Sequence, residues 1–210
     1  MNRKISKVEI DGLEAIFYDE LTLVMSGFTY NKFIKDAIGK INIGVSDDIL
    51  DFGCGTGKNI CIMGNYTQGF LVGFDTSIHM IKQAKTRCRG RNAKIFFHDI
   101  RKPNPFVEQF DIVFISFVLH GFIDSDRDKI IENAFNSLKS GGRFCILDYN
   151  EFNLEDKSIF VRAIFKYGEC PLASEFIGID LKRKLRGFGF VKFEEHLYYS
   201  NLVRLLVAYK

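Results

Sequence analysis

Three glycines stand at alternate positions in the stretch ILDFGCGTG, directly after an apolar run that ends in Asp51. Gly53, Gly55 and Gly57 carry no side chain, so a ligand can lie against the main chain and meet backbone N–H groups. A dinucleotide-binding loop would read G-x-G-x-x-G, and here the third glycine comes one residue early. A carboxylate at Asp51 also suits a cationic ligand better than a pyrophosphate. The stretch therefore predicts a binding loop for a ligand with a positive charge, and Cys54 belongs to the same loop.

Two further acids follow the next two apolar runs. Asp75 ends the run LVGFD, where an acid can accept hydrogen bonds from two ribose hydroxyls. Asp99 follows FFH, where it can accept from the exocyclic amine of adenine or instead cap the loop after it. Three strand-end acids describe one elongated ligand with an amine, a ribose and an aminopurine, and that ligand is S-adenosylmethionine. We expect Thr76 and Ile100 to line the same groove.

The residues that follow the fourth apolar run could form the binding site of a methyl acceptor. We expect Ser116 to contact the methionine end of the cofactor and Phe117 to wall the acceptor site together with Tyr18 and Tyr30. His120 can act as a general base on an acceptor hydroxyl or thiol, because histidine titrates near neutral pH. The alternatives are a packing or water-holding histidine and an ordinary aromatic core. A sulfonium methyl group is already activated, so we expect no metal ion.

The elements that must position these residues are short apolar runs alternating with helical patterns. The runs are rich in Ile, Val and Phe throughout, as buried parallel strands are, and they cover residues 48–52, 70–74, 94–97, 110–116 and 143–148. Helical periodicity covers 77–88, 125–140 and 174–187, with Gly141 beyond the end of the second helix, and residues 190–210 read as a hairpin. The alternation predicts an α/β fold with a doubly wound, mostly parallel sheet and an antiparallel C-terminal hairpin.

The length of 210 residues fits one well-buried domain and is short for two. Within a single domain we expect an N-terminal helical segment over 1–44 and a cofactor-binding core over 45–149. A lid insertion is expected over 150–175, followed by a helix and the hairpin over 176–210. The oligomeric state is left open by the sequence.

The net charge and the cysteine pattern indicate which binding partners and which cellular compartment to expect. A net charge of +3 gives no sign of nucleic acid, and the basic cluster LKRKLR at 181–186 suits the solvated face of a helix. Five scattered cysteines without a C-x-x-C pair argue against disulfides and structural zinc, and for a reducing compartment. The N-terminus lacks a signal-peptide pattern, and the longest apolar run, 112–119, is too short to span a bilayer. We therefore expect a cytoplasmic protein without a transmembrane segment.

Five motifs in order resemble those of the class I S-adenosylmethionine-dependent methyltransferases, from about residue 46 to 149 and more loosely beyond. They read ILDFGCGTG, GFDTS, HDI, FDIVFISFVLHGF and LKSGGRFCILDY. The segment FYDELTLVMSGFTYNKFI is similar to the N-terminal region of ubiquinone/menaquinone C-methyltransferases. After the fifth strand those enzymes carry an acidic EFSKP-like signature, whereas this chain reads DYNEFN. The resemblance implies a Rossmann-like, seven-stranded fold and methyl transfer from S-adenosylmethionine, with S-adenosylhomocysteine as the product.

The resemblance implies a small-molecule acceptor, methylated by in-line displacement. The loop after the fourth strand has neither an N/D-P-P-Y/F motif nor a cysteine, which argues against a nucleic-acid substrate. Three alternatives stay open: a catalytically silent cofactor-binding subunit of a partner protein, a methyltransferase acting on protein or RNA, and a nicotinamide-dependent oxidoreductase. The glycine spacing disfavours the last of these.

Overall fold

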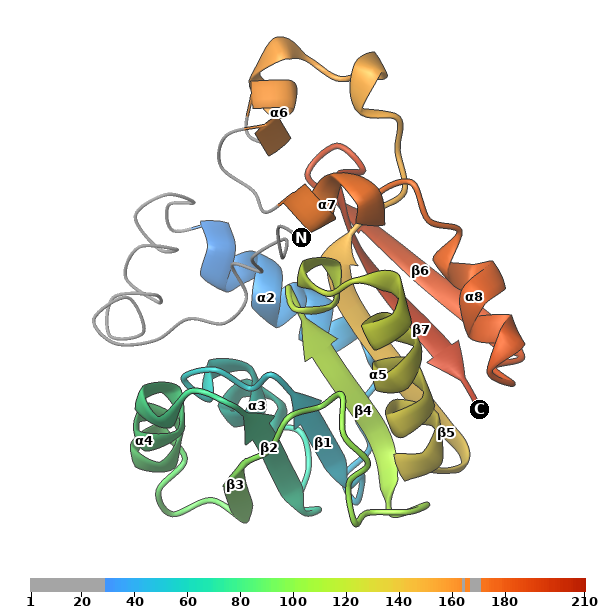
Figure 1. The fold of residues 1–210 in the computed structure, drawn as a ribbon. Helices are drawn as coiled ribbons and strands as arrows, with labels where there is room; N and C mark the ends of the chain where they lie inside the picture. Colours follow the sequence, from blue (N-terminus) through green and yellow to red (C-terminus); the bar gives the residue numbers. More distant parts are fainter. Residues whose placement is uncertain (1–28, 164, 167–170) are drawn as a thin grey trace.

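The computed structural model describes residues 29–163, 165–166 and 171–210 of the chain, and a single seven-stranded sheet forms its centre (Figure 1). The strand order is β3-β2-β1-β4-β5-β7-β6. The strands are β1 (Ile49–Phe52), β2 (Leu71–Asp75), β3 (Ala93–Phe97), β4 (Phe110–Ser116), β5 (Leu138–Tyr149), β6 (Lys192–Tyr198) and β7 (Val203–Tyr209).

The pairing of these strands confirms the expected fold class. β3, β2, β1, β4 and β5 run parallel to their neighbours, while β7 pairs antiparallel with both β5 and β6. The strand order reverses between β1 and β4, and in open α/β sheets a ligand binds beside such a reversal, at the carboxyl ends of the strands. The topology thus places the glycine loop after β1 at the expected binding edge.

Helices cover both faces of the sheet and bury two separate apolar clusters. One face is covered by α2 (Thr29–Lys40), α3 (Lys58–Met63) and α4 (Ile78–Arg87), and the other by α5 (Asp124–Ser137) and α8 (Leu181–Gly187). The short elements η1 (Leu119–Gly121), η2 (Leu154–Asp156), α6 (Ile159–Ala163) and α7 (Pro171–Phe176) lie beyond the carboxyl ends of the strands. Among the helices of the described residues, none is long and apolar enough to cross a membrane.

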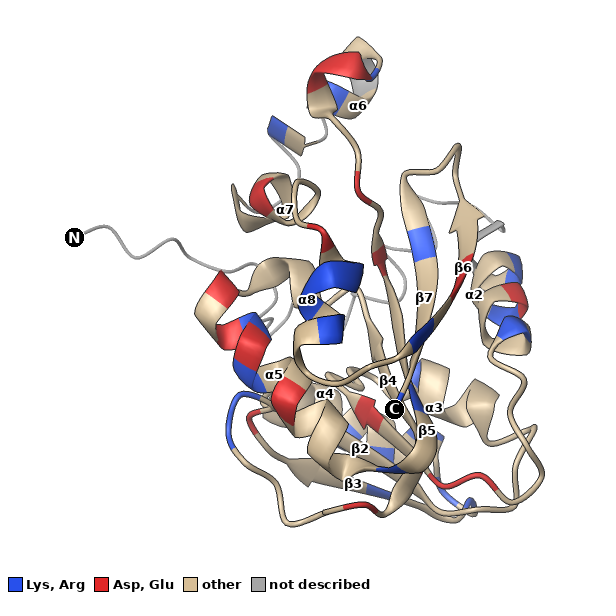
Figure 2. Ribbon diagram, turned by 90° about the vertical axis from the view of Figure 1, so that its right-hand side faces the viewer, with Lys and Arg blue, Asp and Glu red and all other residues tan. Residues whose placement is uncertain are grey.

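The expected single helix over 174–187 is wrong, because the chain forms two helices there. α7 ends at Phe176, and α8 begins after Asp180, whose side chain accepts a hydrogen bond from the Arg183 N–H and caps the new helix. The basic face of α8 lies beside the acidic start of α5 (Figure 2), where Lys184 pairs with Asp124 and Asp128. The apolar residues of α8 are buried, as the amphipathic pattern predicts.

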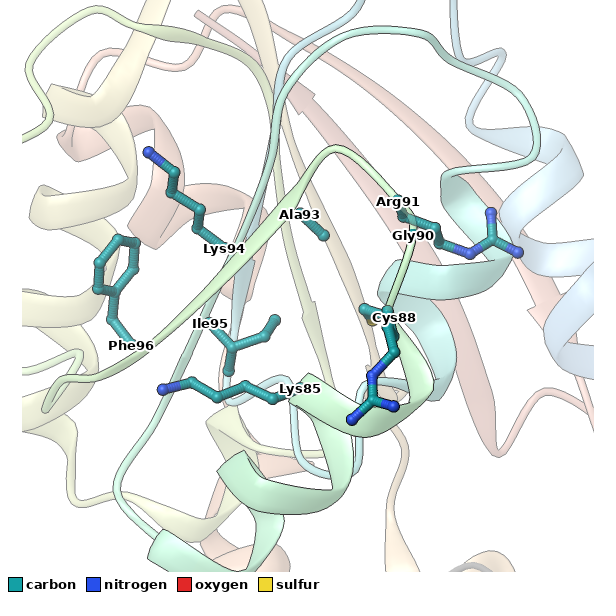
Figure 3. Close-up of a pocket in the computed structure, with 9 residues that line it drawn as sticks. Lys85, Cys88, Gly90, Arg91, Ala93, Lys94, Ile95 and Phe96 are labelled. Carbon is teal, nitrogen blue, oxygen red and sulfur yellow. The ribbon is translucent and has the colours of Figure 1, made fainter.

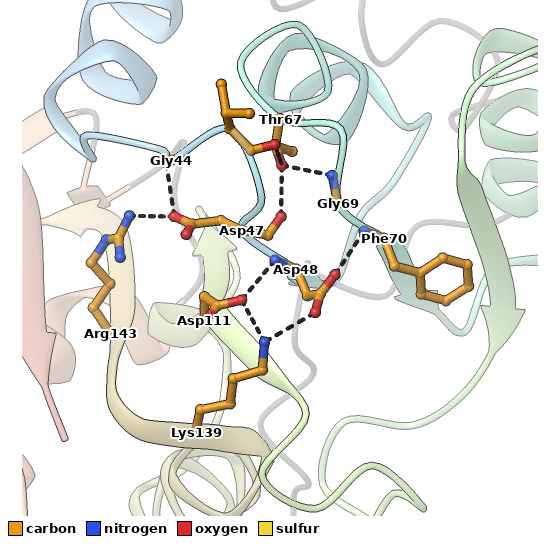
Figure 4. A network of polar contacts seen from close by, with 10 residues as sticks. Gly44, Asp47, Asp48, Thr67, Gly69, Phe70, Asp111, Lys139 and Arg143 are labelled. Carbon is orange, nitrogen blue, oxygen red and sulfur yellow. Dashed lines mark hydrogen bonds and ion pairs between the residues drawn. The ribbon is translucent and has the colours of Figure 1, made fainter.

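Charged side chains fix the amino-terminal ends of the central strands, opposite the binding edge. The Lys139 ammonium group lies 3.0 Å from an oxygen of Asp48 and 2.7 Å from an oxygen of Asp111 (Figure 4). These hydrogen bonds, first of all the one to Asp111, raise the pKa of Lys139. Because Asp48 precedes β1 and Asp111 lies at the start of β4, the contacts hold the two strands in register next to the order reversal.

Candidate functional site

The glycine loop combines three left-handed backbone positions, and only one of them faces open space. Gly53, Gly55 and Gly57 have φ angles of 70°, 52° and 77°, a region that disfavours side chains. A Cβ atom on Gly53 would meet Val118 Cγ2 at 2.8 Å, and one on Gly57 would meet the Ala84 Cα at 2.9 Å. A Cβ on Gly55 would meet nothing within 4 Å. Two glycines are therefore required by packing, and Gly55 leaves its backbone open to a ligand.

Asp51 is a buried carboxylate with one unsatisfied oxygen. The residue is 2% exposed, and its Oδ2 atom has no hydrogen-bond partner among the described residues. Burial, and next the negative charge of Asp75, raises the pKa of Asp51 well above its usual value. A buried unpaired acceptor is costly, so its presence at the binding edge points to a donor supplied by a ligand.

Asp75 ends β2 and joins the glycine loop to the start of α4. Its Oδ2 atom accepts a hydrogen bond from the Gly55 N–H at 2.9 Å, and its Oδ1 atom accepts one from the Ser77 N–H at 2.8 Å. Ser77 in turn caps α4 by accepting from the Met80 N–H. The carboxylate therefore lies beside the open glycine, as a ribose-binding acid would, and the ribose contact itself stays a prediction.

Asp99, after β3, is held by a single neighbour. Its two oxygens accept four hydrogen bonds from Arg101, one from the backbone N–H and three from the guanidinium group, at 2.8–3.1 Å. The hydrogen bonds from the Arg101 side chain lower the pKa of Asp99 most strongly. The loop-capping alternative is thus present in the structure. An adenine amine would have to compete with Arg101, so the adenine contact stays a prediction.

The remaining predicted cofactor residues lie at the same edge in different surroundings. Cys54 is buried against β2, with its Sγ atom 2.8 Å from the position of a Cβ on Gly73. Thr76 is exposed beside Asp75, and Ser116 ends β4 half-buried. Ile100 is 6% exposed and belongs to the apolar cluster under α5.

His120 and Asp148 form a buried pair at the ends of β4 and β5. The Nδ1 atom of His120 lies 2.7 Å from Asp148 Oδ1, and the His120 backbone N–H donates to Asp148 Oδ2 at 3.1 Å. The two residues are 7% and 1% exposed. A carboxylate partner requires the hydrogen on Nδ1, which makes Nε2 the proton-accepting nitrogen of the neutral ring.

Aromatic rings surround this pair and continue towards α2 and the segment after η2. The Tyr149 ring lies 5.0 Å from the ring of His120 and 5.0 Å from that of Phe165. Phe117 connects Tyr149 to Phe33 of α2, at centroid distances of 6.2 and 6.4 Å. Phe117 itself adopts a left-handed φ of 53°, a strained backbone that often marks functional sites.

A fully buried arginine side chain, that of Arg127, connects the η1 turn to α7 through hydrogen bonds. The Arg127 guanidinium lies 3.3–3.4 Å from the carbonyl oxygens of Leu119, His120 and Leu172. It also reaches a carboxylate oxygen of Glu175 at 3.3 Å and stacks over the ring of Phe176 at 5.2 Å. Burial lowers the pKa of Arg127, and the nearby carboxylates oppose that shift. The position of His120 is thus linked to α7.

The structure brings the predicted cofactor residues to one edge of the sheet and sets His120 and Phe117 beside it. Tyr18 lies outside the described residues, and so does the side chain of Tyr30. Asp148 and Arg127 were missed at the sequence level. Asp148 ends the fifth apolar run just as Asp51 and Asp75 end theirs, so the strand-end signal was available for it.

The chemistry of these groups fits S-adenosylmethionine. The unsatisfied oxygen of Asp51 would accept from the ammonium group of its methionine part, the open backbone at Gly55 would lie against it, and Asp75 is close enough to that backbone to hold a ribose. No group of three or more metal-ligating side chains occurs in the part of the chain that the structure describes.

Comparisons with known proteins identify methyltransferases among the relatives of this chain. Residues 49–142 match the family model of a methyltransferase domain. The ubiquinone/menaquinone biosynthesis C-methyltransferase UbiE of Vibrio parahaemolyticus is 29% identical over 184 residues, which are 84% of this chain and 70% of that protein. Phosphoethanolamine N-methyltransferase 1 of Triticum aestivum is 29% identical over 118 residues, which are 55% of this chain and 23% of that protein. The match thus spans less than a quarter of the wheat enzyme.

Solved structures show the same fold at low sequence identity. A putative methyltransferase in complex with the Trm112 methyltransferase activator, from Haloferax volcanii, superposes with a TM-score of 0.72 at 13% identity and covers 98% of both chains. A methyltransferase from Aquifex aeolicus superposes with a TM-score of 0.64 at 15% identity, over 84% of this chain and 88% of the other. The methyltransferase-domain match and the UbiE relatives support a class I S-adenosylmethionine-dependent methyltransferase of the UbiE-like type.

Proposed function

We propose that this enzyme methylates a small, largely apolar acceptor and that His120 removes the acceptor's proton. The observation that carries the proposal is the buried His120–Asp148 pair beside the cofactor edge. The contact fixes the hydrogen on Nδ1 and makes Nε2 the proton-accepting nitrogen, as a general base requires. Both curated relatives act, by their names, on small molecules, which supports an acceptor of that class here.

The chain's own residues would bind, orient and accept a proton. When bound, S-adenosylmethionine supplies an activated methyl group for in-line transfer. Asp51, Gly55 and Asp75 would fix the cofactor along the carboxyl ends of β1 and β2. Asp148 holds the Nδ1 hydrogen of His120, so that Nε2 takes the proton released by an acceptor hydroxyl, thiol or acidic carbon. The positive charge that forms on the ring lies against the Asp148 carboxylate and is stabilised by it.

The surroundings of His120 favour an apolar or aromatic acceptor. Tyr149, Phe117 and Phe165 present ring faces and edges around it, and such surfaces pack against flat apolar molecules and exclude water. Aromatic faces also attract the cationic methyl donor. We propose that the segment 150–175, which contributes Phe165, closes over the acceptor as a lid.

Labelled methyl donor tests the acceptor class. The protein is incubated with S-adenosylmethionine carrying an isotopic methyl group and with separate small-molecule, RNA and protein fractions of a cell extract. We expect label in the small-molecule fraction, in products that partition into organic solvent. Label in RNA or protein instead would contradict the proposal, and no label in any fraction would support a catalytically silent subunit.

Variants of the buried pair test the base, once an acceptor is found. His120→Gln should lower kcat by about 10²–10⁴-fold while cofactor binding is retained. Asp148→Asn should lower kcat by a smaller factor. Wild-type kcat should fall at acidic pH, where His120 is protonated, and the fall should be lost in His120→Gln. His79→Gln, at an exposed histidine, is the matched control. An unchanged pH profile in His120→Gln would remove His120 from the reaction.

A further inference from the structure

The small net charge of the chain conceals a strongly basic segment. Residues 76–98 contain six Lys and Arg residues and no Asp or Glu, although the whole chain carries only +3. In the structure this segment forms α4, the following turn and the edge strand β3. An open depression of about 350 Å³ lies there, and its lining includes the four cations Lys85, Arg89, Arg91 and Lys94 (Figure 3). It is separate from the edge that carries Asp51 and His120.

The strand at this edge has an unpaired side. β3 pairs with β2 and with no other described strand. The Asn92 carbonyl accepts from the Leu71 N–H of β2, and the His98 N–H donates to the Asp75 carbonyl. Because backbone groups of a strand alternate in direction, residues 94 and 96 also turn towards β2. The N–H and C=O groups of Ile95 and Phe97 therefore point away from the sheet, as an accepting edge requires.

Cations flank this free edge on both sides. Figure 3 shows Lys94 and Phe96 projecting on one side of β3, while Lys85 and Cys88 lie on the side of α4. None of the four lining cations forms an ion pair with a described residue, whereas Lys139 and Lys184 elsewhere are both paired. The edge thus combines outward backbone groups with positive charge that the described chain does not neutralise.

We propose that β3 binds an extended, acidic segment of a partner protein as an added eighth strand. Main-chain hydrogen bonds to Ile95 and Phe97 would give the register, and alternate acidic side chains of the segment would meet Lys94 on one face and Lys85 or Arg89 on the other. A second copy of this chain would bring like charges together across the edge, which is unfavourable.

Two other occupants fit the edge less well. A single strand of nucleic acid would need aromatic rings along one path, but Phe96 and Phe97 alternate to opposite faces of β3. A small anion would need cations that converge, and these are divided between the two sides of the strand. Lysines on an edge strand also discourage pairing with neutral strands. This repulsion of neutral strands is compatible with the proposal, because the lysines leave only an acidic strand as a favourable partner.

A synthetic probe tests the proposal without knowledge of the natural partner. The probe is a fluorescent peptide as long as β3 in which glutamate and valine alternate, and binding to the full chain is followed by anisotropy. We expect saturable binding with a Kd below about 1 mM. The same peptide with alternate amides N-methylated should bind at least about tenfold more weakly. Hydrogen exchange should become slower at the amides of Ile95 and Phe97 when the peptide binds.

Matched variants separate backbone pairing from charge. Phe97→Pro removes the outward N–H and should abolish binding, whereas Phe97→Ala keeps the N–H and should retain it. Lys85→Glu with Arg89→Glu should weaken binding at least about tenfold. The same charge change at the exposed Lys35 and Lys40 of α2 should not. Circular dichroism of each variant shows whether it is folded.

Several results would overturn the proposal. They are no binding of the peptide at about 1 mM, equal binding of the N-methylated peptide, and protection of amides other than those of β3. Tighter binding of an oligouridine than of the peptide would assign the edge to nucleic acid. A dimer of the chain that Phe97→Pro dissociates would assign it to a second copy.

Discussion

Replacement of Asp51 by Asn should affect stability and cofactor binding in opposite directions. In the free protein, burial raises the pKa of Asp51, so the ionised carboxylate destabilises the fold at every pH above about 4, the value in an unfolded chain. Asn keeps the shape and removes the charge. We expect the free energy of unfolding at neutral pH to rise by about 1 kcal/mol, because Asn cannot ionise and so removes the penalty that the raised pKa of the Asp51 carboxyl places on the folded state. For a chain of this length that is about 2–4 °C in Tm.

The same substitution should weaken binding of the cofactor. A hydrogen bond between the ammonium group and the Asp51 carboxylate is worth about 1.5–3 kcal/mol, so Kd for S-adenosylmethionine should rise about 10- to 150-fold. Titration calorimetry gives the affinity and thermal unfolding gives Tm. Asp156→Asn, at an exposed carboxylate, is the control and should change neither. A Kd within about twofold of the wild type would show that Asp51 does not hold the ammonium group.

Four further predictions concern the same edge. Asp75→Ala should weaken binding of S-adenosylhomocysteine by about 1.5–3 kcal/mol in calorimetry; an unchanged affinity in a folded variant would exclude a ribose contact. Gly55→Ala should cost about 1–2 kcal/mol of stability through its left-handed φ and weaken cofactor binding. Gly57→Ala should lower Tm further, because its Cβ also meets Ala84 at 2.9 Å; equal Tm values would contradict this. Finally, a cation that binds beside Asp51 should displace a proton, so affinity should rise with pH, and calorimetry in buffers of different ionisation enthalpy should detect proton release.

The sheet could be predicted from the sequence because its signals are local. Continuous apolar runs mark the buried parallel strands, and strand-end acids with a glycine loop mark the binding edge. The helix over 174–187 was wrong because its periodicity continues across the break. In the structure α7 ends at Phe176, and the hydrogen bond from the Arg183 N–H to the Asp180 side chain caps the start of a second helix.

The site was harder to predict because the surroundings of His120 depend on contacts between segments that lie far apart in the sequence. His120 and Asp148 are 28 positions apart, and Arg127 meets Glu175 across 48. Helical periodicity would place Arg127 on the polar, exposed face of α5. Nothing in the local sequence distinguishes such an exposed arginine from the buried one that the structure shows. The three glycines looked equivalent in the sequence, although Gly55 alone among them faces open space.

The buried Arg127 has a consequence for exchanging segments of this chain with those of related methyltransferases. Its guanidinium cannot lose its charge, so a chimera that replaces its partners with unrelated residues leaves an uncompensated cation in the interior, which is severely destabilising. The segment that follows β5 can therefore be exchanged between methyltransferases only up to Pro171. From Leu172 to Phe176 the donor sequence must supply the carbonyl, the carboxylate and the ring that Arg127 uses. Arg127 thus marks the point at which the exchangeable segment ends and the scaffold that receives it begins.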